Sequence, residues 1–393
     1  MDTVTVSRDA AAQGPLLPSR GPATWKDMFF MKYKTFALTA LALAASSAAL
    51  AQSGSDSSTS QVTLYGVVDA NVQVLDGAAT TTRVQSGGLN GSRFGLRGSE
   101  DLGGGLRAFF TLESGINLDN GTNGQNAFWG RQAFVGLATP YGKVSLGRQY
   151  GSLYNLSSDF SQFSNNSFGA STALIGGFNG YEPVRGGDGS ATSNGGPTRI
   201  NNSIKFESQN YSGFSAGALW GMGEVAGDTK GNRVADIYGR YTQGGFDAQI
   251  SFVDDKANTI GLKTRTVAGA ASYAFGPYKV NGGVISVDDR SATNADGDGY
   301  WLGASYTLGQ HTFKTQYVES KNKYVLNEGK SQAFGVGYQY DLSKRTALYS
   351  SLTRFNNDGG SYVPRAAAAI PAGLTNGSDR DLTEFVAGIR HSF

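Results

Sequence analysis

Apolar and polar residues alternate with a period of two along most of the chain from residue 61 to its end. In the first such segment, Val62 and Leu64 fall on one face, while Thr63 and Tyr65 fall on the other. This alternation is typical of a strand with one apolar and one polar face. No stretch of useful length after residue 51 shows a helical period, so the pattern predicts an all-β fold.

Sixteen alternating segments are predicted. Most run for about nine to twelve residues, which is the length that a tilted strand needs to cross a membrane. Their residues are 61–71, 91–99, 104–116, 127–138, 142–149, 198–208, 211–222, 232–242, 245–254, 264–275, 277–288, 299–308, 311–322, 331–341, 345–355 and 383–393.

The connections between these segments alternate between short and long. Tight turns follow the even-numbered segments, as at 139–142 and 341–344, and longer polar stretches follow the odd-numbered ones. Bacterial outer-membrane barrels are built in this way, from an even number of antiparallel strands. We therefore expect one sixteen-stranded antiparallel transmembrane β-barrel whose first and last strands pair. The long stretches are 77–90, 117–126, 150–197, 223–231, 255–262, 289–298, 323–330 and 356–382.

The residues before the barrel have the layout of an export signal. Lys32 and Lys34 precede a short apolar run, and a small-x-small site ends directly before Gln52. The layout favours a cleaved signal peptide, because the apolar run is too short for a membrane anchor. The expected divisions are a non-native upstream extension at 1–30, the signal peptide at 31–51, a short tract at 52–60 and the barrel at 61–393.

Composition and charge exclude several classes of protein. The chain has no cysteine, so it holds no disulfide framework or zinc-thiolate site. Of its 33 basic and 31 acidic residues, five basic and three acidic lie in 1–51, which leaves 28 of each in the mature chain. This balance argues against a nucleic-acid-binding surface. We expect no cofactor.

One acidic stretch is similar to a calcium-binding loop. Asn294, Asp296 and Asp298 alternate before Gly299, but the twelfth position is Ser305 instead of glutamate. A solvated outer loop is the preferred interpretation, so no metal site is assigned. Divalent ions bridging this loop to lipopolysaccharide phosphates stay a second possibility.

Several motifs spread over the barrel point to one family. They are TLYGVVDA at 63–70, SRFGLRGSEDLGGGLRAFFTLESG at 92–115, RQAFVGL at 131–137, GKVSLGRQYG at 142–151 and GIRHSF at 388–393. Together they resemble the general porins of Gram-negative β-proteobacteria, the group that includes the Neisseria, Comamonas and Burkholderia porins. The resemblance implies a water-filled trimeric channel in the outer membrane. It also implies a third loop, folded into the lumen, whose acidic residues face arginines of the wall.

The wall arginines are assigned by this resemblance. Arg93 and Arg131 match two of them, and the alternation supports both if Phe94 and Phe134 face lipid. Arg199 is the best match for the third, with Arg185 as an alternative.

Two further arginines, Arg97 and Arg107, share the inward faces of their strands. They either belong to the same basic wall or form an ion-pair lattice. The constriction loop is placed at about 150–197, the longest stretch without a strand pattern.

The acids of this loop are few. Asp159 is the favoured pore residue, Glu182 is the next, and Asp188 is the remaining one. The family's usual acidic element is not recognisable. Because the arginines outnumber the acids, we expect passive passage of ions and small hydrophilic solutes with a moderate anion preference.

Two other functions are weighed against this one. An outer-membrane enzyme needs a nucleophile beside a base, and the only histidines are His311 and His391, both placed near strand ends. A substrate-specific channel for a small anionic or sugar solute would need an aromatic slide or a basic ladder. The inward aromatics Tyr65, Phe109 and Trp129 are too scattered to favour one.

The remaining expectations concern assembly. The terminal Phe393 resembles the signal that the barrel-assembly machinery recognises, and it also suits an aromatic girdle. Gly66 and Ala70 are small residues on the outward face, which suits close packing in a homotrimer. Outer-membrane lipid and lipopolysaccharide complete the expected partners.

Overall fold

A computed structural model describes residues 60–163, 198–228, 231–257, 262–290, 296–322, 329–359 and 381–393. These residues belong to one compact unit, Ser58–Phe393. The expected extension and signal peptide, Glu182, Asp188 and Arg185 lie outside the described residues.

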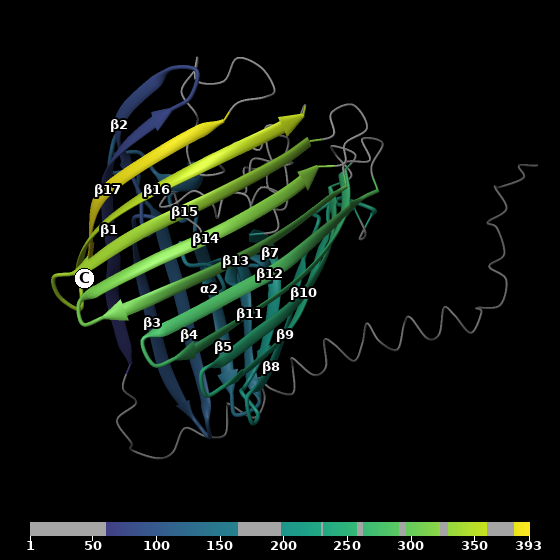
Figure 1. Cartoon of the computed structure of the whole chain (residues 1–393). Helices are drawn as coiled ribbons and strands as arrows, with labels where there is room; N and C mark the ends of the chain where they lie inside the picture. Colours follow the sequence, from purple (N-terminus) through teal and green to yellow (C-terminus); the bar gives the residue numbers. More distant parts are fainter. Residues whose placement is uncertain are drawn as a thin grey trace, which may run out of the picture. The chain divides into compact units, whose positions relative to one another are not determined.

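The described part of the chain is almost entirely β-structure (Figure 1). Its strands are β1 (Gln61–Asp76), β2 (Thr80–Ser86), β3 (Arg93–Gly103), β4 (Leu106–Gly115), β5 (Gln132–Thr139), β6 (Gly142–Tyr150), β7 (Arg199–Ser208), β8 (Phe214–Gly221), β9 (Val234–Gln243), β10 (Phe246–Ala257), β11 (Leu262–Phe275), β12 (Tyr278–Asp289), β13 (Gly297–Leu308), β14 (His311–Asn322), β15 (Gly329–Asp341), β16 (Thr346–Gly359) and β17 (Leu382–Ser392). The helices are the 3₁₀ turn η1 (Gly124–Asn126) and α2 (Ser152–Asp159).

The strands form one closed antiparallel sheet. From β3 onward each strand pairs with its neighbours in the chain, and β1 pairs with β3 and with β17, so that the ring has no open edge. The strand β2 is an addition to the prediction, inside the expected loop 77–90. The strand β2 pairs with residues 70–76 of β1, and β3 pairs with residues 61–67 of β1. The strands β2 and β3 therefore occupy one position in the ring. The ring therefore has the sixteen positions that the sequence predicted.

The alternation gives the sheet a polar inner face and an apolar outer face. Ile250, Val284 and Leu302 are each more than 60% exposed on the outside. Gln249, Ser251 and Gln316 alternate with such residues and point inward, where they are buried.

Outward aromatic side chains form contacts near the short turns, as in Phe275 against Tyr278 and Phe313 against Tyr338. Such a girdle is expected where a barrel meets a membrane surface. Among the described residues, no helix is long and apolar enough to cross a bilayer.

Two predictions about the fifth strand are wrong. The expected segment 127–138 begins as a strand only at Gln132, and Phe134 points inward, where its ring lies 6.2 Å from that of Phe109. The inward and outward positions of this strand are therefore exchanged relative to the prediction, because residues 127–131 do not belong to the ladder. For the same reason Trp129 is not an inward aromatic but packs on the outer residues Phe94 and Phe128.

Candidate functional site: an arginine-lined lumen beside an inner helix

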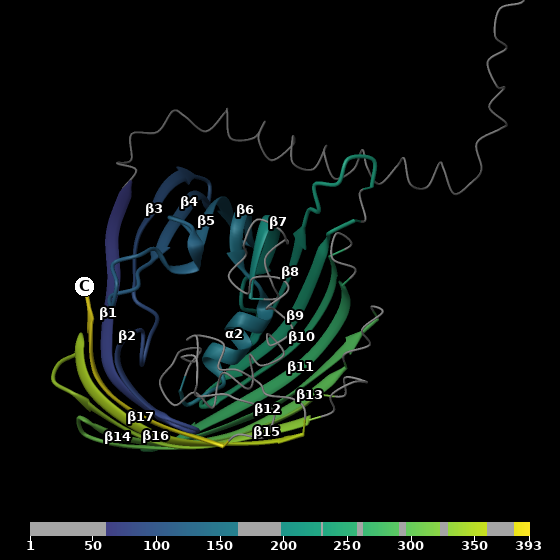
Figure 2. The same ribbon diagram turned by 90° about the horizontal axis from the view of Figure 1, so that it is seen from above.

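The helix α2 lies inside the ring of strands (Figure 2). No helix was predicted after residue 51, so α2 corrects the all-β prediction at this point. The helix begins at Ser152, whose backbone N–H donates to Asp236 Oδ2 at 2.6 Å, and Gln249 Nε2 donates to the Ser152 carbonyl at 3.0 Å. Inward side chains of β9 and β10 thus hold the first turn, which satisfies groups that a helix end leaves open.

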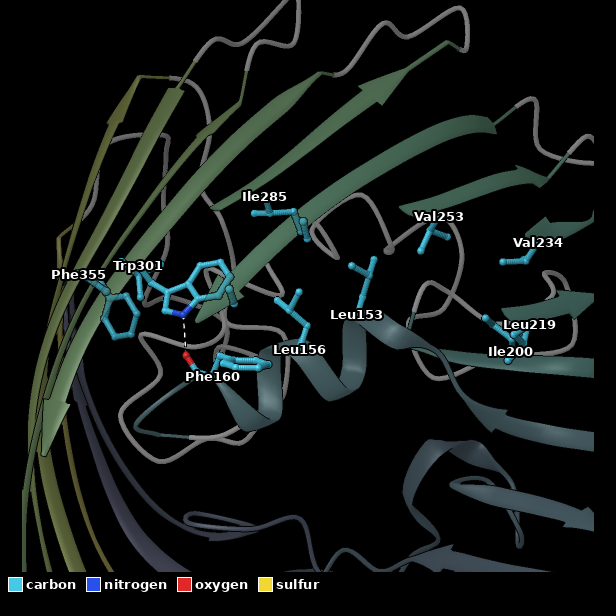
Figure 3. Close-up of a cluster of buried hydrophobic side chains, with 14 of the residues drawn as sticks. Leu153, Leu156, Phe160, Ile200, Leu219, Val234, Val253, Ile285, Trp301 and Phe355 are labelled. Carbon is cyan, nitrogen blue, oxygen red and sulfur yellow. Dashed lines mark hydrogen bonds between the residues drawn. The ribbon is translucent and has the colours of Figure 1, made fainter. Parts of the chain in front are cut away.

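The apolar side of α2 packs on the barrel wall (Figure 3). Leu153, Leu156 and Phe160 recur at helical spacing and are buried against inward residues such as Val253, Ile285 and Trp301. This spacing places them on one face of the helix. Eight residues are too few for a sequence periodicity to stand out, and the helix is stable here because the wall covers its apolar face.

The residues after α2 are tied to the wall by side-chain hydrogen bonds. The Phe160 carbonyl accepts from Trp301 Nε1 at 2.7 Å and from Asn281 Nδ2 at 2.6 Å. The Gln162 backbone N–H donates to Gln316 Oε1 at 2.8 Å. The segment 152–163 therefore follows the inner wall from β9 to β14, which leaves the β1–β7 side of the lumen facing it.

An arginine group lines that opposite side, around one carboxylate. Glu113 Oε1 lies 2.8 Å from Arg131 Nε, and Glu113 Oε2 lies 3.5 Å from Arg93 Nε. The same carboxylate accepts from the hydroxyls of Tyr65 at 3.0 Å and Tyr150 at 2.9 Å. Glu113 and Arg131 are buried, and together with these partners they form a rigid polar network.

Glu113 was not singled out from the sequence, although it shares a face of β4 with Arg107, which was expected to point inward. The available signal was that inward position combined with the family-like arginines on either side of it.

A stacked pair of tyrosines extends this group toward the helix. The rings of Tyr150 and Tyr154 are parallel, with centroids 3.8 Å apart. Arg199 Cζ lies 5.4 Å from each centroid, and Arg131 Nη2 donates to the Tyr154 hydroxyl at 3.2 Å. Burial raises the pKa of Tyr154, but Arg131 and Arg199 outweigh it and hold this pKa below its ordinary value.

The other two predicted wall arginines lie apart from Glu113. Arg97 packs over the ring of Tyr65, with its Cζ 5.1 Å from the centroid, so it borders the group. Arg107 lies just after the turn between β3 and β4, six residues before Glu113. At the rise of a strand this is about 20 Å from the group, so the structure does not bring Arg107 to it.

Asp159 lies in a second charged group, on the helix side. It pairs with Arg240 Nη1 at 2.6 Å, and Arg240 also makes a bidentate contact with Asp247, at 2.8 and 2.5 Å. Two carboxylates thus share one guanidinium, so these three side chains together carry one net negative charge. The structure therefore brings Asp159 to Arg240, a residue that sequence reasoning missed, and not to the predicted wall arginines.

The two histidines lie away from both groups. His311 Nδ1 is 2.8 Å from the Tyr338 hydroxyl, and His391 Nδ1 is 2.9 Å from Thr346 Oγ1, both at the short-turn end of the barrel. Among the described residues, no cluster of side chains has the composition of a metal site. The lumen therefore has the arginine group around Glu113 on one wall and the Asp159–Arg240–Asp247 group on the helix side.

Comparison with known proteins identifies porins as similar to this chain. The family model described as "Gram-negative porin" matches residues 37–360. An outer membrane porin protein of Delftia acidovorans, number 32, is 34% identical over 91% of this chain and 99% of its own length. An outer membrane porin protein of Bordetella pertussis is 30% identical, over 86% and 96%.

The solved structure of an anion-selective porin from Comamonas acidovorans is also similar. It is 29% identical with a TM-score of 0.71, and the match covers 85% of this chain and all of the other.

Proposed function

The chain belongs to the Gram-negative porin family and is an outer-membrane channel, and we propose that it is a general diffusion pore with a moderate preference for anions. One observation carries this preference. On the wall opposite α2, four arginines (Arg93, Arg97, Arg131 and Arg199) line one side of the lumen, and in the described part of the chain Glu113 is the carboxylate that pairs with them. Guanidinium groups stay charged at all accessible pH values, so the field there is permanently positive.

The mechanism is electrostatic. Anions are attracted by the arginine group, while the Asp159–Arg240–Asp247 group on the helix side carries one net negative charge. This separation produces a transverse field that orients dipolar solutes as they pass. The assignment of the narrowest point to these groups is part of the proposal, and so is the role of Glu182 as a second acid.

A reversal potential in a KCl gradient tests the proposal. Purified channels in a planar bilayer are expected to give a potential of the sign set by chloride. A potential of the sign set by potassium would contradict it. The chain is proposed to act as a channel without enzymatic activity, and the absence of esterase turnover by the same preparation is the corresponding expectation.

The alternative of a substrate-specific channel has less support. The Tyr65 hydroxyl donates to Glu113 and its ring contacts Arg97, while the ring of Phe109 packs against Phe134. The inward aromatic side chains therefore form no continuous row along the lumen. Saturable block of single-channel current by one class of solute would favour this alternative.

A homotrimer is proposed as the assembled form, as in the solved trimer form of an outer-membrane protein of Vibrio cholerae that shares the fold. The smallness of Gly66, however, has another cause. A side chain there would lie 2.3 Å from the ring of Phe393, so Gly66 makes room for the last residue and carries no argument for contacts between barrels.

A further inference from the structure

The connection between β2 and β3 lies on the inner side of the barrel. Its residues, 87–92, are here called the inner turn. On β1, pairing with β3 stops at Val67 and pairing with β2 starts only at Ala70, and the buried, inward-facing Asp69 lies in this gap. The Gly87 N–H donates to the Asp69 carbonyl at 2.7 Å, so the inner turn leaves the sheet at this residue.

The Asp69 carboxylate holds the inner turn by its backbone. Oδ1 accepts from the N–H of Gly88 at 3.0 Å, and Oδ2 accepts from those of Leu89 and Asn90 at 2.9 and 2.6 Å. The hydroxyl of Tyr349, from β16, also donates to Oδ1. Successive backbone N–H groups form a concavity that suits an anion, and here the chain fills it with its own carboxylate. Because buried N–H groups without an acceptor are costly, these bonds tie the turn to Asp69.

The inner turn also receives the far end of the segment 152–163. Leu89 forms one buried apolar cluster with Phe163, Tyr349 and Val386. Phe163 is the last described residue of that segment, and its side chain is fully buried. The segment therefore starts on β9 and ends on the inner turn, so the position of the turn sets the position of this end.

Two arginines of the lumen are bound by the inner turn. The Gly91 carbonyl accepts from Arg93 Nη1 at 3.0 Å. Asn90 Oδ1 accepts from Arg390 Nη1 at 3.1 Å. Arg93 is one of the four arginines on which the proposed anion preference depends. A displaced turn would therefore move one guanidinium of the arginine group and release the end of the segment 152–163 at the same time.

We propose that Asp69 is a positioning residue for the selectivity of the channel. By holding the inner turn, it sets the direction of the Arg93 guanidinium and the width of the passage between the arginine group and the segment 152–163. The proposal rests on the proposed function, because the arginine group is the source of the anion preference.

A wider passage selects less, since fixed charges are screened over about 10 Å at 0.1 M salt. The ladders of β1 with β2 and β3 do not include residues 87–92, so the turn can move while the ring stays folded.

Reversal potentials and single-channel currents of Asp69→Asn test the proposal. Asparagine keeps the size of the side chain, but its amide NH₂ replaces one of the two acceptor oxygens, so the turn loses part of its attachment. The chloride-to-potassium permeability ratio is expected to fall by about twofold or more, with higher conductance and a noisier open state. Loss of a negative charge by itself could only raise this ratio, so the direction of the change separates positioning from simple electrostatics.

Gly88→Ala is a second variant, and it changes no charge. Its methyl group would overlap the Tyr349 hydroxyl and displace the inner turn, so the same fall in the permeability ratio is expected. Glu384→Gln is the control. It removes another buried, inward carboxylate, which accepts from Gln73 of β1, and should give a quiet current and a ratio no lower than that of wild type.

Heat-modifiable migration on a gel shows which variants fold, and Gly88→Ala decides the question if Asp69→Asn does not. An unchanged or higher ratio in Asp69→Asn would overturn the proposal, and so would wild-type behaviour of Gly88→Ala. Failure of both variants to fold would also overturn it, because the turn would then be needed for the ring itself. A cation-selective wild type would defeat the proposed anion preference, whereas higher conductance and noise in both variants would still support the positioning of the passage by Asp69.

Discussion

At the scale of single residues, Glu113 determines how much positive charge the lumen shows. Among the residues that the structure describes, it is the one carboxylate that pairs with the wall arginines, and four side chains donate to it or pair with it. Its charge is therefore subtracted directly from that of Arg93 and Arg131.

Glu113→Gln removes this charge and keeps the shape of the side chain. The preference for chloride over potassium is expected to rise at least about twofold, because the arginine field is no longer offset. The variant should also unfold more readily, by about 3–5 kcal/mol, since buried Arg131 loses its partner. Reversal potentials and thermal unfolding measure the two effects. Glu100→Gln, the same charge change at an exposed position near the short turns, is the control, and an equal shift there would contradict the argument.

Tyr154 gives the lumen a dependence on pH. Its pKa lies below the ordinary tyrosine value of about 10, because Arg131 and Arg199 favour the phenolate over the opposing effect of burial. Raising the pH therefore adds a negative charge between two arginines earlier than an ordinary tyrosine would. Anion preference should fall as the pH rises toward 10, and Tyr154→Phe should abolish that early fall. Identical reversal potentials for both proteins across this range would refute the assignment.

At the scale of elements, α2 depends on its apolar face for its position. Leu156 is 1% exposed within the cluster that includes Leu153 and Phe160. Leu156→Ala is expected to cost about 2–5 kcal/mol in packing. The loosened helix should appear as added noise in open-channel current recordings. Ser158→Ala, on the less buried side of the helix, should leave the current quiet.

The seam between β1 and β17 depends on a glycine. Gly66 and Phe393 exchange two backbone hydrogen bonds, of 3.1 and 3.0 Å, and the Phe393 ring covers Gly66. Gly66→Val should lower the yield of heat-modifiable, folded barrel by overpacking of about 1–3 kcal/mol. Gly239→Ala is the control, because its added methyl group would meet nothing within 4 Å. A normal yield of the Gly66→Val barrel would contradict the role of Phe393 in closing the β1–β17 seam. This test does not address the predicted role of Phe393 as an assembly signal.

At the scale of the whole molecule, selectivity depends on local charge and not on the net charge. The chain after residue 51 is expected to be neutral, yet its lumen groups are separated by sign. Exposed fixed charges are screened over about 10 Å at 0.1 M salt and about 3 Å at 1 M. The chloride preference should therefore decrease steadily as symmetric KCl is raised at a constant gradient ratio. A preference that does not change with salt would indicate selection by size instead.

Much of this architecture could be predicted from the sequence. The strands, their alternation and the single ring followed from a period of two that each residue pair carries locally, and the tight turns are likewise local. Arg93, Arg131 and Arg199 were singled out as candidates because they match family-like motifs, and their role in the pore stays a prediction. The inward position of Phe134 was not predicted, because the irregular residues 127–131 before the strand shift its side chains to the other face.

The tertiary structure decided which charges meet. Asp159 joined Arg240, 81 residues away in the chain, and Glu113 joined Arg93 of β3 and Arg131, which lies directly before β5. The helix α2 formed because inward residues of β9–β14 cover its apolar face, a condition that eight residues of sequence do not reveal. The period-two alternation and the tight turns depend on residues that are close in the chain, so they can be predicted from the sequence. Pairing across a lumen depends on how the closed sheet brings distant residues together.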